Sequence, residues 1–343
     1  MLILAKPKHK GMPASTIRIR YNKLAAWSLF ILLILWSGTE STNGSGIPGF
    51  LKPENASGLK VAEAGEFSVI TYNIAGLPAI ISSAATERSS SIAEIGLRLN
   101  RFDIVHVQED FNYHENLYAQ GNTHAFRTET KGGVPLGDGL NTLSRYPVRD
   151  LRRITWNDCT GADCLTPKGF TFSRIEVAKN VFIDFYNIHA NAYNDLPAAA
   201  ARRKNMAQFS EYIKIHSHDN AVIVMGDLNG HYSYFYDNIK LLNTENKLED
   251  VWTSFVHKNR FPPVHKDLPV SNILSINESS ETIDKILFRS SRLLEIHVSD
   301  YQLQNLLFLN QDGIPLSDHH PVSAQFSWNL KKNTGKEKET SKP

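Results

Sequence analysis

The spacing of apolar positions changes several times after residue 66. Residues 67–73 (FSVITYN) and 181–189 (VFIDFYNIH) alternate apolar and polar side chains, which is typical of strands. Residues 197–216 have helical spacing, and residues 91–99 predict a helix with a Ser cap. Further strands are expected at residues 103–108, 169–177, 221–225, 282–288 and 321–326. Strands interleaved with helices predict α/β or α+β layers, and we see no internal boundary that would split them into two domains.

The amino-terminal region has a different pattern. Residues 24–36 (LAAWSLFILLILW) are apolar at every position but Ser28, and a basic stretch precedes them. This run is short for a membrane span but matches the core of a secretory signal, and small residues follow it as a cleavage site requires. An uncleaved signal-anchor is the alternative. We therefore expect a signal peptide or signal-anchor, a linker, one folded domain and a Lys-rich flexible tail, at residues 1–38, 39–65, 66–328 and 329–343.

Other features agree with export. Asn-x-Ser triplets, which are acceptors for N-glycosylation, begin at Asn43, Asn55 and Asn277. Cys159 and Cys164 are the two cysteines of the chain, and an oxidising compartment favours a local disulfide between them. Two free thiols are the alternative, and neither state makes a metal site. We expect the protein to be secreted, or anchored with its folded domain outside the cytoplasm.

Composition and charge narrow the class of protein. With 41% hydrophobic and 21% charged residues, the chain is an ordinary globular protein and not a disordered or disulfide-dense one. Its net charge of +2 is unevenly distributed, because residues 1–38 carry six basic and no acidic residues. Once the Lys-rich tail is also set aside, 26 basic residues face 33 acidic ones. Such a domain offers no broad polyphosphate-binding surface, which counts against a nucleic-acid partner.

Polar residues that bind metal ions or move protons follow the predicted strands. Carboxylate and amide oxygens suit Mg²⁺, and histidines beside carboxylates suit acid–base catalysis near neutral pH. Asp284 lies within a strand-like segment, where an unpaired charge is costly, and a partner such as His319 would remove that cost. Each of these short polar segments, or strings, has an ordinary structural explanation when it is taken alone, such as a turn or a buried histidine. Together they predict metal-assisted attack of water on a phosphate. The set is Asn73, Glu109, His189, Asp227, Asn229, Asp284 and His319.

These strings resemble those of the endonuclease/exonuclease/phosphatase superfamily, whose fold is that of deoxyribonuclease I. The motifs TYNIAGLP, VQED, DGLNTLSRYP, NIHANA, GDLN, TIDKIL and SDHHPV come in the family's order between about residues 66 and 328. The resemblance implies a four-layer α/β/β/α sandwich, in which two mixed sheets pack together with helices outside. It also implies that residues 66–328 are a catalytic domain.

By position in these motifs, the resemblance implies a role for each residue. Glu109 is similar to the principal Mg²⁺ ligand, with Mn²⁺ as a substitute, and Asn73 to the amide beside metal and phosphate. Asp227 and Asn229 resemble the pair that positions the attacking water and a phosphate oxygen. His319 looks like a general base oriented by Asp284, although the roles of Asp227 and His319 could exchange. His189 matches the histidine that stabilises charge on the phosphate, and Asp318 a supporting residue or second metal ligand.

The substrate class is the next question. The segment 163–170 (DCLTPKGF), with Lys168, is similar to a stretch in sphingomyelinase C-type phospholipases, and so is Asn191 placed shortly after His189. This similarity implies that Lys168 and Asn191 bind substrate phosphate. Asp110 after the metal ligand departs from the sphingomyelinase pattern. Residues 232–236 (YSYFY) and 306–309 (LLFL) are candidates for membrane contact, but packing explains each better. Residues 232–236 are expected to pack beneath the active-site loop, and residues 306–309 to form an edge or core strand.

We therefore expect an exported, Mg²⁺-dependent phosphodiesterase that resembles sphingomyelinase C and acts as a monomer on a phospholipid. A secreted endonuclease and an inositol polyphosphate or phosphoinositide phosphatase are the alternatives. Against the phosphatase, Gly230-His231 stands where those enzymes place Tyr-Arg, and Lys285 where they carry Arg. A non-catalytic binding protein with the same fold is a further alternative. Such proteins usually lose metal-binding or catalytic residues, and this sequence has all of them.

Overall fold

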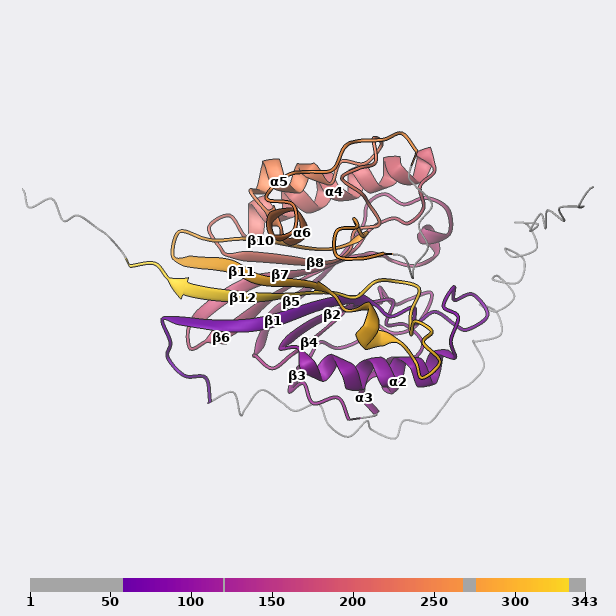
Figure 1. The fold of residues 1–343 in the computed structure, drawn as a ribbon, viewed down its shortest axis with the longest axis horizontal. Coiled ribbons are helices and arrows are strands. Elements are labelled where there is room, and N and C mark those ends of the chain that lie inside the picture. The colour runs from indigo at the N-terminus through magenta and orange to yellow at the C-terminus, as the bar shows by residue number, and fades with distance from the viewer. Residues whose placement is uncertain (1–57, 120, 268–275, 333–343) are drawn as a thin grey trace, which may run out of the picture. The chain divides into compact units, whose positions relative to one another are not determined.

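Two mixed β-sheets of six strands each lie at the centre of the structure, which is a computed structural model (Figure 1). It describes residues 58–332, apart from residue 120 and residues 268–275. The expected signal segment, the triplets at Asn43 and Asn55, and the tail from residue 333 lie outside the described residues. Among the described helices, none combines the length and the apolar character needed to cross a membrane.

The first sheet has the order β11-β12-β1-β2-β4-β3. Its central strands β1 and β2 are parallel, and every other neighbouring pair is antiparallel. The carboxyl ends of β1 and β2 therefore lie at the same edge of the sheet. The strands are β1 (Ala64–Asn73), β2 (Ile104–Gln108), β3 (Phe126–Arg127), β4 (Asn141–Ser144), β11 (Leu294–Leu303) and β12 (Val322–Leu330).

The second sheet repeats this arrangement with the order β5-β6-β7-β8-β10-β9. Here β7 and β8 are the parallel pair, and the other pairs are antiparallel. Because β10 is antiparallel to β8, it begins where β8 ends. The strands are β5 (Val148–Thr155), β6 (Gly169–Ala178), β7 (Val181–His189), β8 (Val222–Asp227), β9 (Glu249–Asp250) and β10 (Asp284–Arg289).

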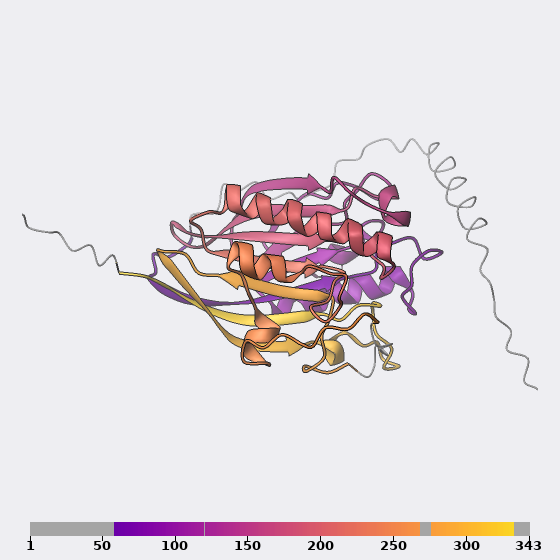
Figure 2. The same ribbon diagram turned by 90° about the horizontal axis from the view of Figure 1, so that it is seen from above.

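The helices cover the outer faces of the two sheets. In Figure 1, α2 and α3 lie on the first sheet, while α4 and α5 lie on the second. Figure 2 looks down on α4, which lies over the second sheet. The result is the expected four-layer α/β/β/α sandwich. The helices are α2 (Arg88–Arg98), α3 (His114–Ala119), α4 (Leu196–His216), α5 (Lys240–Asn246) and α6 (Val251–Phe255), with 3-10 turns η2 (Leu99–Arg101), η3 (Gly161–Leu165) and η5 (Asn305–Phe308).

The alternation of side chains along β1 explains how one strand serves two cores. Phe67 and Val69 point toward the second sheet, where the ring of Phe67 lies 6.2 Å from that of Phe185. Ile70 and Tyr72 point the other way, into a separate apolar core beneath α2. Successive side chains of a strand alternate between its faces, so residues 67–73 read as a strand buried on both sides.

The inner faces of the sheets become polar near the carboxyl ends of their central strands. Gln108 Nε2 donates to Thr71 Oγ1 at 3.0 Å and to Asn187 Oδ1 at 2.7 Å. Asn187 Nδ2 in turn donates to the carbonyl of Val107 at 3.0 Å. These bonds link three strands of two sheets, and a fully satisfied buried network of this kind fixes their relative positions.

Some expected elements differ from the observed ones. The first helix begins at Arg88, and its cap is the carboxylate of Glu87, which accepts the N–H groups of Ser89 and Ser90. Ser91 was the expected cap but lies inside the helix, because a carboxylate at the N-terminus satisfies the free N–H groups equally well. The apolar run 306–309 is no strand: Leu306 lies in η5 and its side chain is 86% exposed. Strands β3, β4, β5, β9 and β11 were not expected.

Candidate active site

Six segments that are far apart in the sequence bring polar side chains to one end of the sandwich. Asn73 ends β1, and Glu109 directly follows β2, its parallel neighbour. His189 ends β7 and Asp227 ends β8, and these two residues are paired in the register of the second sheet. Asp284, the first residue of β10, is paired with Asp227 from the other side. The sixth segment, the loop before β12, carries His319.

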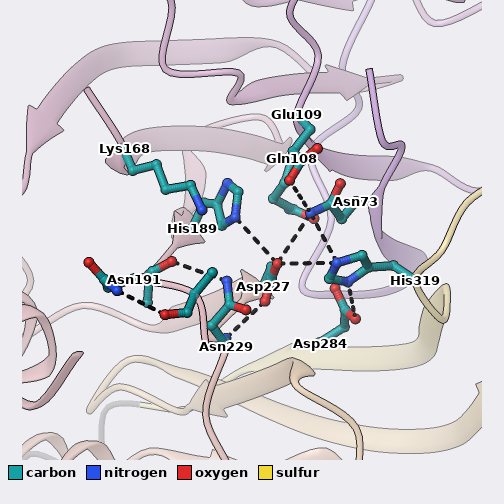
Figure 3. A network of polar contacts seen from close by, with 12 residues as sticks. Asn73, Gln108, Glu109, Lys168, His189, Asn191, Asp227, Asn229, Asp284 and His319 are labelled. Carbon is teal, nitrogen blue, oxygen red and sulfur yellow. Dashed lines mark hydrogen bonds and ion pairs between the residues drawn. The ribbon is translucent and has the colours of Figure 1, made fainter. Parts of the chain in front are cut away.

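Asp227 lies between two histidine rings (Figure 3). Its Oδ2 atom is 3.4 Å from His189 Nε2 and 3.7 Å from His319 Nε2. On its far side, His319 places Nδ1 2.9 Å from Asp284 Oδ2. This is the geometry of a base oriented by a carboxylate, with Nδ1–H donating to Asp284 and Nε2 facing the site.

The two histidines differ in charge because their surroundings differ. Burial by itself lowers the pKa of His319, but the carboxylates of Asp284 and Asp227 outweigh it and raise this pKa well above 6.5. Burial lowers the pKa of His189 well below 6.5, and the positive charges of Lys168 and His319 act in the same direction. His189 is therefore a neutral hydrogen-bond donor beside Asp227, whereas His319 is protonated near neutral pH.

Asn73 contacts three other residues of the site. Its Nδ2 atom lies 3.3 Å from Glu109 Oε1, 3.2 Å from Asp227 Oδ2 and 3.4 Å from His319 Nε2 (Figure 3). Its Oδ1 atom accepts the N–H of Ala75 at 3.1 Å, which fixes the orientation of the amide. Glu109 and His319 thus lie on the same side of the molecule and contact the same amide nitrogen.

Two site residues adopt backbone conformations that side chains normally avoid. Glu109 has φ 58° and Asn229 has φ 49°. Asn229 is held by its N–H, which donates to Asp227 Oδ1 at 2.8 Å, and by Nδ2, which donates to the carbonyl of Ala190 at 3.1 Å. At Gly76, a Cβ atom would lie 2.3 Å from the carbonyl oxygen of Glu109, so glycine allows the loop after β1 to pass Glu109 closely. Such strained positions cluster at functional sites.

Lys168 and Asn191 border the site on the side of His189 (Figure 3). Lys168 is buried, and its Nζ lies 2.8 Å from Asp163 Oδ1. Asn191 Oδ1 accepts the N–H of Thr160 at 2.8 Å. The expected disulfide between Cys159 and Cys164 is present. It closes the loop that contains both Thr160 and Asp163.

The donor set fits a divalent cation at Glu109. The predicted ligand Asn73 turns its amide nitrogen toward Glu109 Oε1, while its Oδ1 accepts the N–H of Ala75. Burial raises the pKa of Glu109, and the positive charges of Lys168 and His319 only partly oppose it. Glu109, Asp227 and Asp284 together place three carboxylates at the site against one protonated histidine, His319, because Lys168 is already paired with Asp163. An added positive charge would offset this excess, and carboxylate oxygens suit a hard cation. Ligand atoms of Asp227, Asp284 and His319 also lie within 4.8 Å of one another.

Two predicted residues lie at the margin. Asp318 is exposed, and its Oδ1 lies 3.4 Å from Ser317 Oγ, so its predicted role in metal binding has no support from contacts in the described part of the chain. Asn277 is exposed in the loop before β10, where its Oδ1 accepts a hydrogen bond from Ser279 Oγ. Glycosylation there stays a prediction.

Comparison with known proteins agrees with this geometry. A sequence profile described as "Endonuclease/Exonuclease/phosphatase family 2" matches residues 84–325. The chain belongs to the endonuclease/exonuclease/phosphatase family. Among curated relatives, sphingomyelinases of Mycobacterium bovis and Mycobacterium tuberculosis are 37% identical over 271 residues, which cover 77% of this chain and 53% of each relative. The chain thus spans about half the length of these family members.

Solved structures show the same fold at lower identity. Sphingomyelinase C from Streptomyces griseocarneus has a TM-score of 0.52 and 18% identity, and covers 76% of this chain and 99% of its own. TDP2 from D. rerio, complexed with a single strand DNA product, has a TM-score of 0.55 and 16% identity, and covers 76% of this chain and 98% of its own. At these identities the likeness establishes the architecture of the family, and the side chains of this site carry the chemistry.

A buried ion pair that was not expected from the sequence holds two loops of the site together. Arg202, in α4, is fully buried, and its Nη2 lies 2.7 Å from Asp237 Oδ1. Its Nη1 donates to the carbonyls of Asn191 and Tyr193, and the N–H of His231 donates to Asp237 Oδ2, so this ion pair joins the loops after β7 and β8. The available signal was an arginine in line with an apolar helix stripe, because a charge there must have a buried partner.

Proposed function

We propose that this chain is a metal-dependent phosphoric ester hydrolase that cleaves a phosphodiester of the sphingomyelin class. The observation that carries the proposal is the cluster in which Asn73 Nδ2 contacts Glu109, Asp227 and His319, with His319 Nδ1 on Asp284. The same side chains would be needed to hold a phosphate ester and to take a proton from water. The 37% identity to mycobacterial sphingomyelinases supports the proposed substrate class.

Each side chain has a defined part in this proposal. A divalent cation held by Glu109, with Mg²⁺ preferred and Mn²⁺ as a substitute, would stabilise negative charge on the phosphate. His319, once deprotonated, accepts the proton of the attacking water at Nε2, while Asp284 stabilises the imidazolium that forms. His189 donates from Nε2 beside Asp227, where charge develops on the phosphate.

A cavity beside His319 supports a lipid substrate. It has a volume of about 680 Å³, within the usual range for small-molecule pockets. His319 lines this cavity, and most of the remaining wall is apolar. Such a wall suits the hydrocarbon part of a lipid. Its lining includes Tyr72, Leu303, Leu306, Phe308 and Pro315.

Exposed apolar side chains surround the site as well. The loops after β1, β7, β8 and β11 and the loop before β4 all emerge at the end of the sandwich where Asn73 and Asp227 meet, as the strand directions require. Each of these five loops carries at least one exposed apolar or aromatic residue, so the end of the sandwich that holds the site presents several apolar side chains to solvent. We infer that this end rests against a lipid surface during turnover. The residues are Ile80, Leu136, Tyr193, Phe235 and Leu306.

We also propose that the protein acts outside the cytoplasm. The disulfide between Cys159 and Cys164 forms and persists in oxidising compartments. The basic and apolar amino-terminal segment of the sequence supports the same proposal, because its pattern matches an export signal, cleaved or retained as an anchor.

The test uses the full chain on sphingomyelin vesicles, with Mg²⁺ or with a chelator. We expect release of phosphocholine that requires the metal and is lost in His319→Ala but kept in His297→Ala, a matched change at an exposed histidine. Plasmid DNA and inositol phosphates form parallel arms. Cleavage of either without phosphocholine release would refute the lipid assignment, and an inactive chain in every arm would refute the hydrolase assignment.

A further inference from the structure

Arg88 lies on the apolar face of α2. Positions 88, 92, 95 and 99 follow helical spacing, and Ile92, Ile95 and Leu99 are fully buried in the core beneath this helix. The Arg88 side chain is also fully buried, at 1% exposure. A guanidinium therefore occupies a place in the helix where the pattern calls for an aliphatic side chain.

The acceptors of Arg88 are carbonyl oxygens and one hydroxyl, none of them a carboxylate. Nε donates to Ala75 O at 3.0 Å and Nη2 to Ile74 O at 2.8 Å. Nη1 and Nη2 both donate to Leu316 O at 2.9 Å, and Nη1 also reaches Thr86 Oγ1 at 3.0 Å. Within the described residues, no ion pair includes this guanidinium.

These carbonyls belong to the two loops that carry the centre of the site. Ile74 and Ala75 directly follow Asn73, and Leu316 lies three residues before His319. Ser317, also buried, closes the same junction, because its Oγ donates to the carbonyl of Asn73 at 2.7 Å. The Arg88 side chain thus forms hydrogen bonds with both loops, which are more than 200 residues apart in the sequence.

Burying a positive charge without a negative partner is costly, and an apolar residue at such a position would usually give a more stable fold. The planar fork of arginine can bind several carbonyls in a fixed geometry, which the single ammonium of lysine cannot do. The hydrogen bonds of Arg88 are therefore better explained by a need to fix the distance between the two loops than by a gain in stability.

We propose that Arg88, together with Ser317, is a positioning residue that sets the separation of Asn73 Nδ2 and His319 Nε2. This role rests on the proposed hydrolase function, since it matters for the placement of the base against the phosphate. Arg88 does not touch the reacting groups. It acts through the backbone of residues 74–75 and 316.

The test compares Arg88→Lys with Arg289→Lys in the full chain. Arg289 is a matched control, because it also donates to backbone carbonyls, those of Asn246 and Ser217, but it lies at the end of β10 opposite Asp284. We expect Arg88→Lys to lower kcat by about 10- to 100-fold, with KM within about twofold, since misplacement of a catalytic group by about 1 Å has this size of effect. Arg289→Lys should lower the melting temperature and leave kcat unchanged.

A second readout does not depend on activity. The ring nitrogen NMR signals of His319 should shift in Arg88→Lys and stay in place in Arg289→Lys. Unchanged kcat and unchanged His319 signals in Arg88→Lys would overturn the inference, even if the melting temperature falls. If wild type proves inactive on every substrate, the proposed function fails and the His319 signals alone decide the role of Arg88. If Arg88→Lys does not fold, Thr86→Val decides it, because it removes one acceptor of Arg88 and leaves the hydrogen bonds of His319 in place: shifted His319 signals support the proposal and unshifted ones overturn it.

Discussion

His106 offers a sharp test of how the core beneath the site is built. Its ring is fully buried between the sheets, with Nδ1 3.4 Å from the carbonyl of Met225 and its plane edge-on to Phe185. Burial lowers the pKa of His106 from 6.5 to about 3, and the carbonyl of Met225 only partly opposes this. The ring is therefore neutral in the folded protein throughout the mildly acidic range.

The sign and size of the effect follow from this pKa. A depressed histidine pKa means that the unfolded chain binds a proton that the folded protein refuses, so stability is lost as the pH falls below 6.5, down to about 3. Each pH unit in this window costs about 1.4 kcal/mol. Acidification from about pH 7.5 to about pH 4.5 should therefore cost roughly 2.7 kcal/mol of unfolding free energy through His106 alone.

Urea denaturation of wild type and His106→Leu at these two pH values measures the effect. The variant should lose roughly 2.7 kcal/mol less than wild type on acidification, whatever the other histidines contribute, because they are present in both proteins. Phe185→Leu is the control: it removes packing against the same ring without a titrating group, so its cost should be similar at both pH values. Equal losses in wild type and His106→Leu would show that His106 is not buried as a neutral ring.

Three further predictions concern the site. Glu109→Gln should weaken Mg²⁺ or Mn²⁺ binding in calorimetric titrations by on the order of 100-fold or more, with the melting temperature of the metal-free protein nearly unchanged; undiminished affinity would place the ion elsewhere. Asp284→Asn should lower kcat by about 100- to 10,000-fold, since the amide cannot stabilise protonated His319, and a steady-state rate near wild type would exclude this pair as the base. Replacing Cys159 and Cys164 by Ser should lower stability in urea by about 2 kcal/mol, as expected for so short a loop, and no loss would show that the disulfide adds nothing to stability.

Several elements could be predicted because their signals are local. Residues 181–189 were expected as a strand from alternation alone, and β7 has these bounds. The helix α4 differs from its expected range by one residue. β5 gave a weaker signal, because an edge strand with three arginines lacks the apolar alternation that burial on both faces produces. The 3-10 turn η5 was misread as a strand because a short apolar run does not reveal whether it is buried.

The sequence by itself determined the set of catalytic strings and their positions after strands, since each string is a short continuous segment that its own residues specify. Only the tertiary structure decided that Asn73 contacts His319, 246 residues away, and that Arg88 fills an aliphatic position to hold their loops. Such contacts depend on sheet order, register and the packing of one sheet on the other. No local pattern encodes them, because the free energy that selects them comes from the whole core.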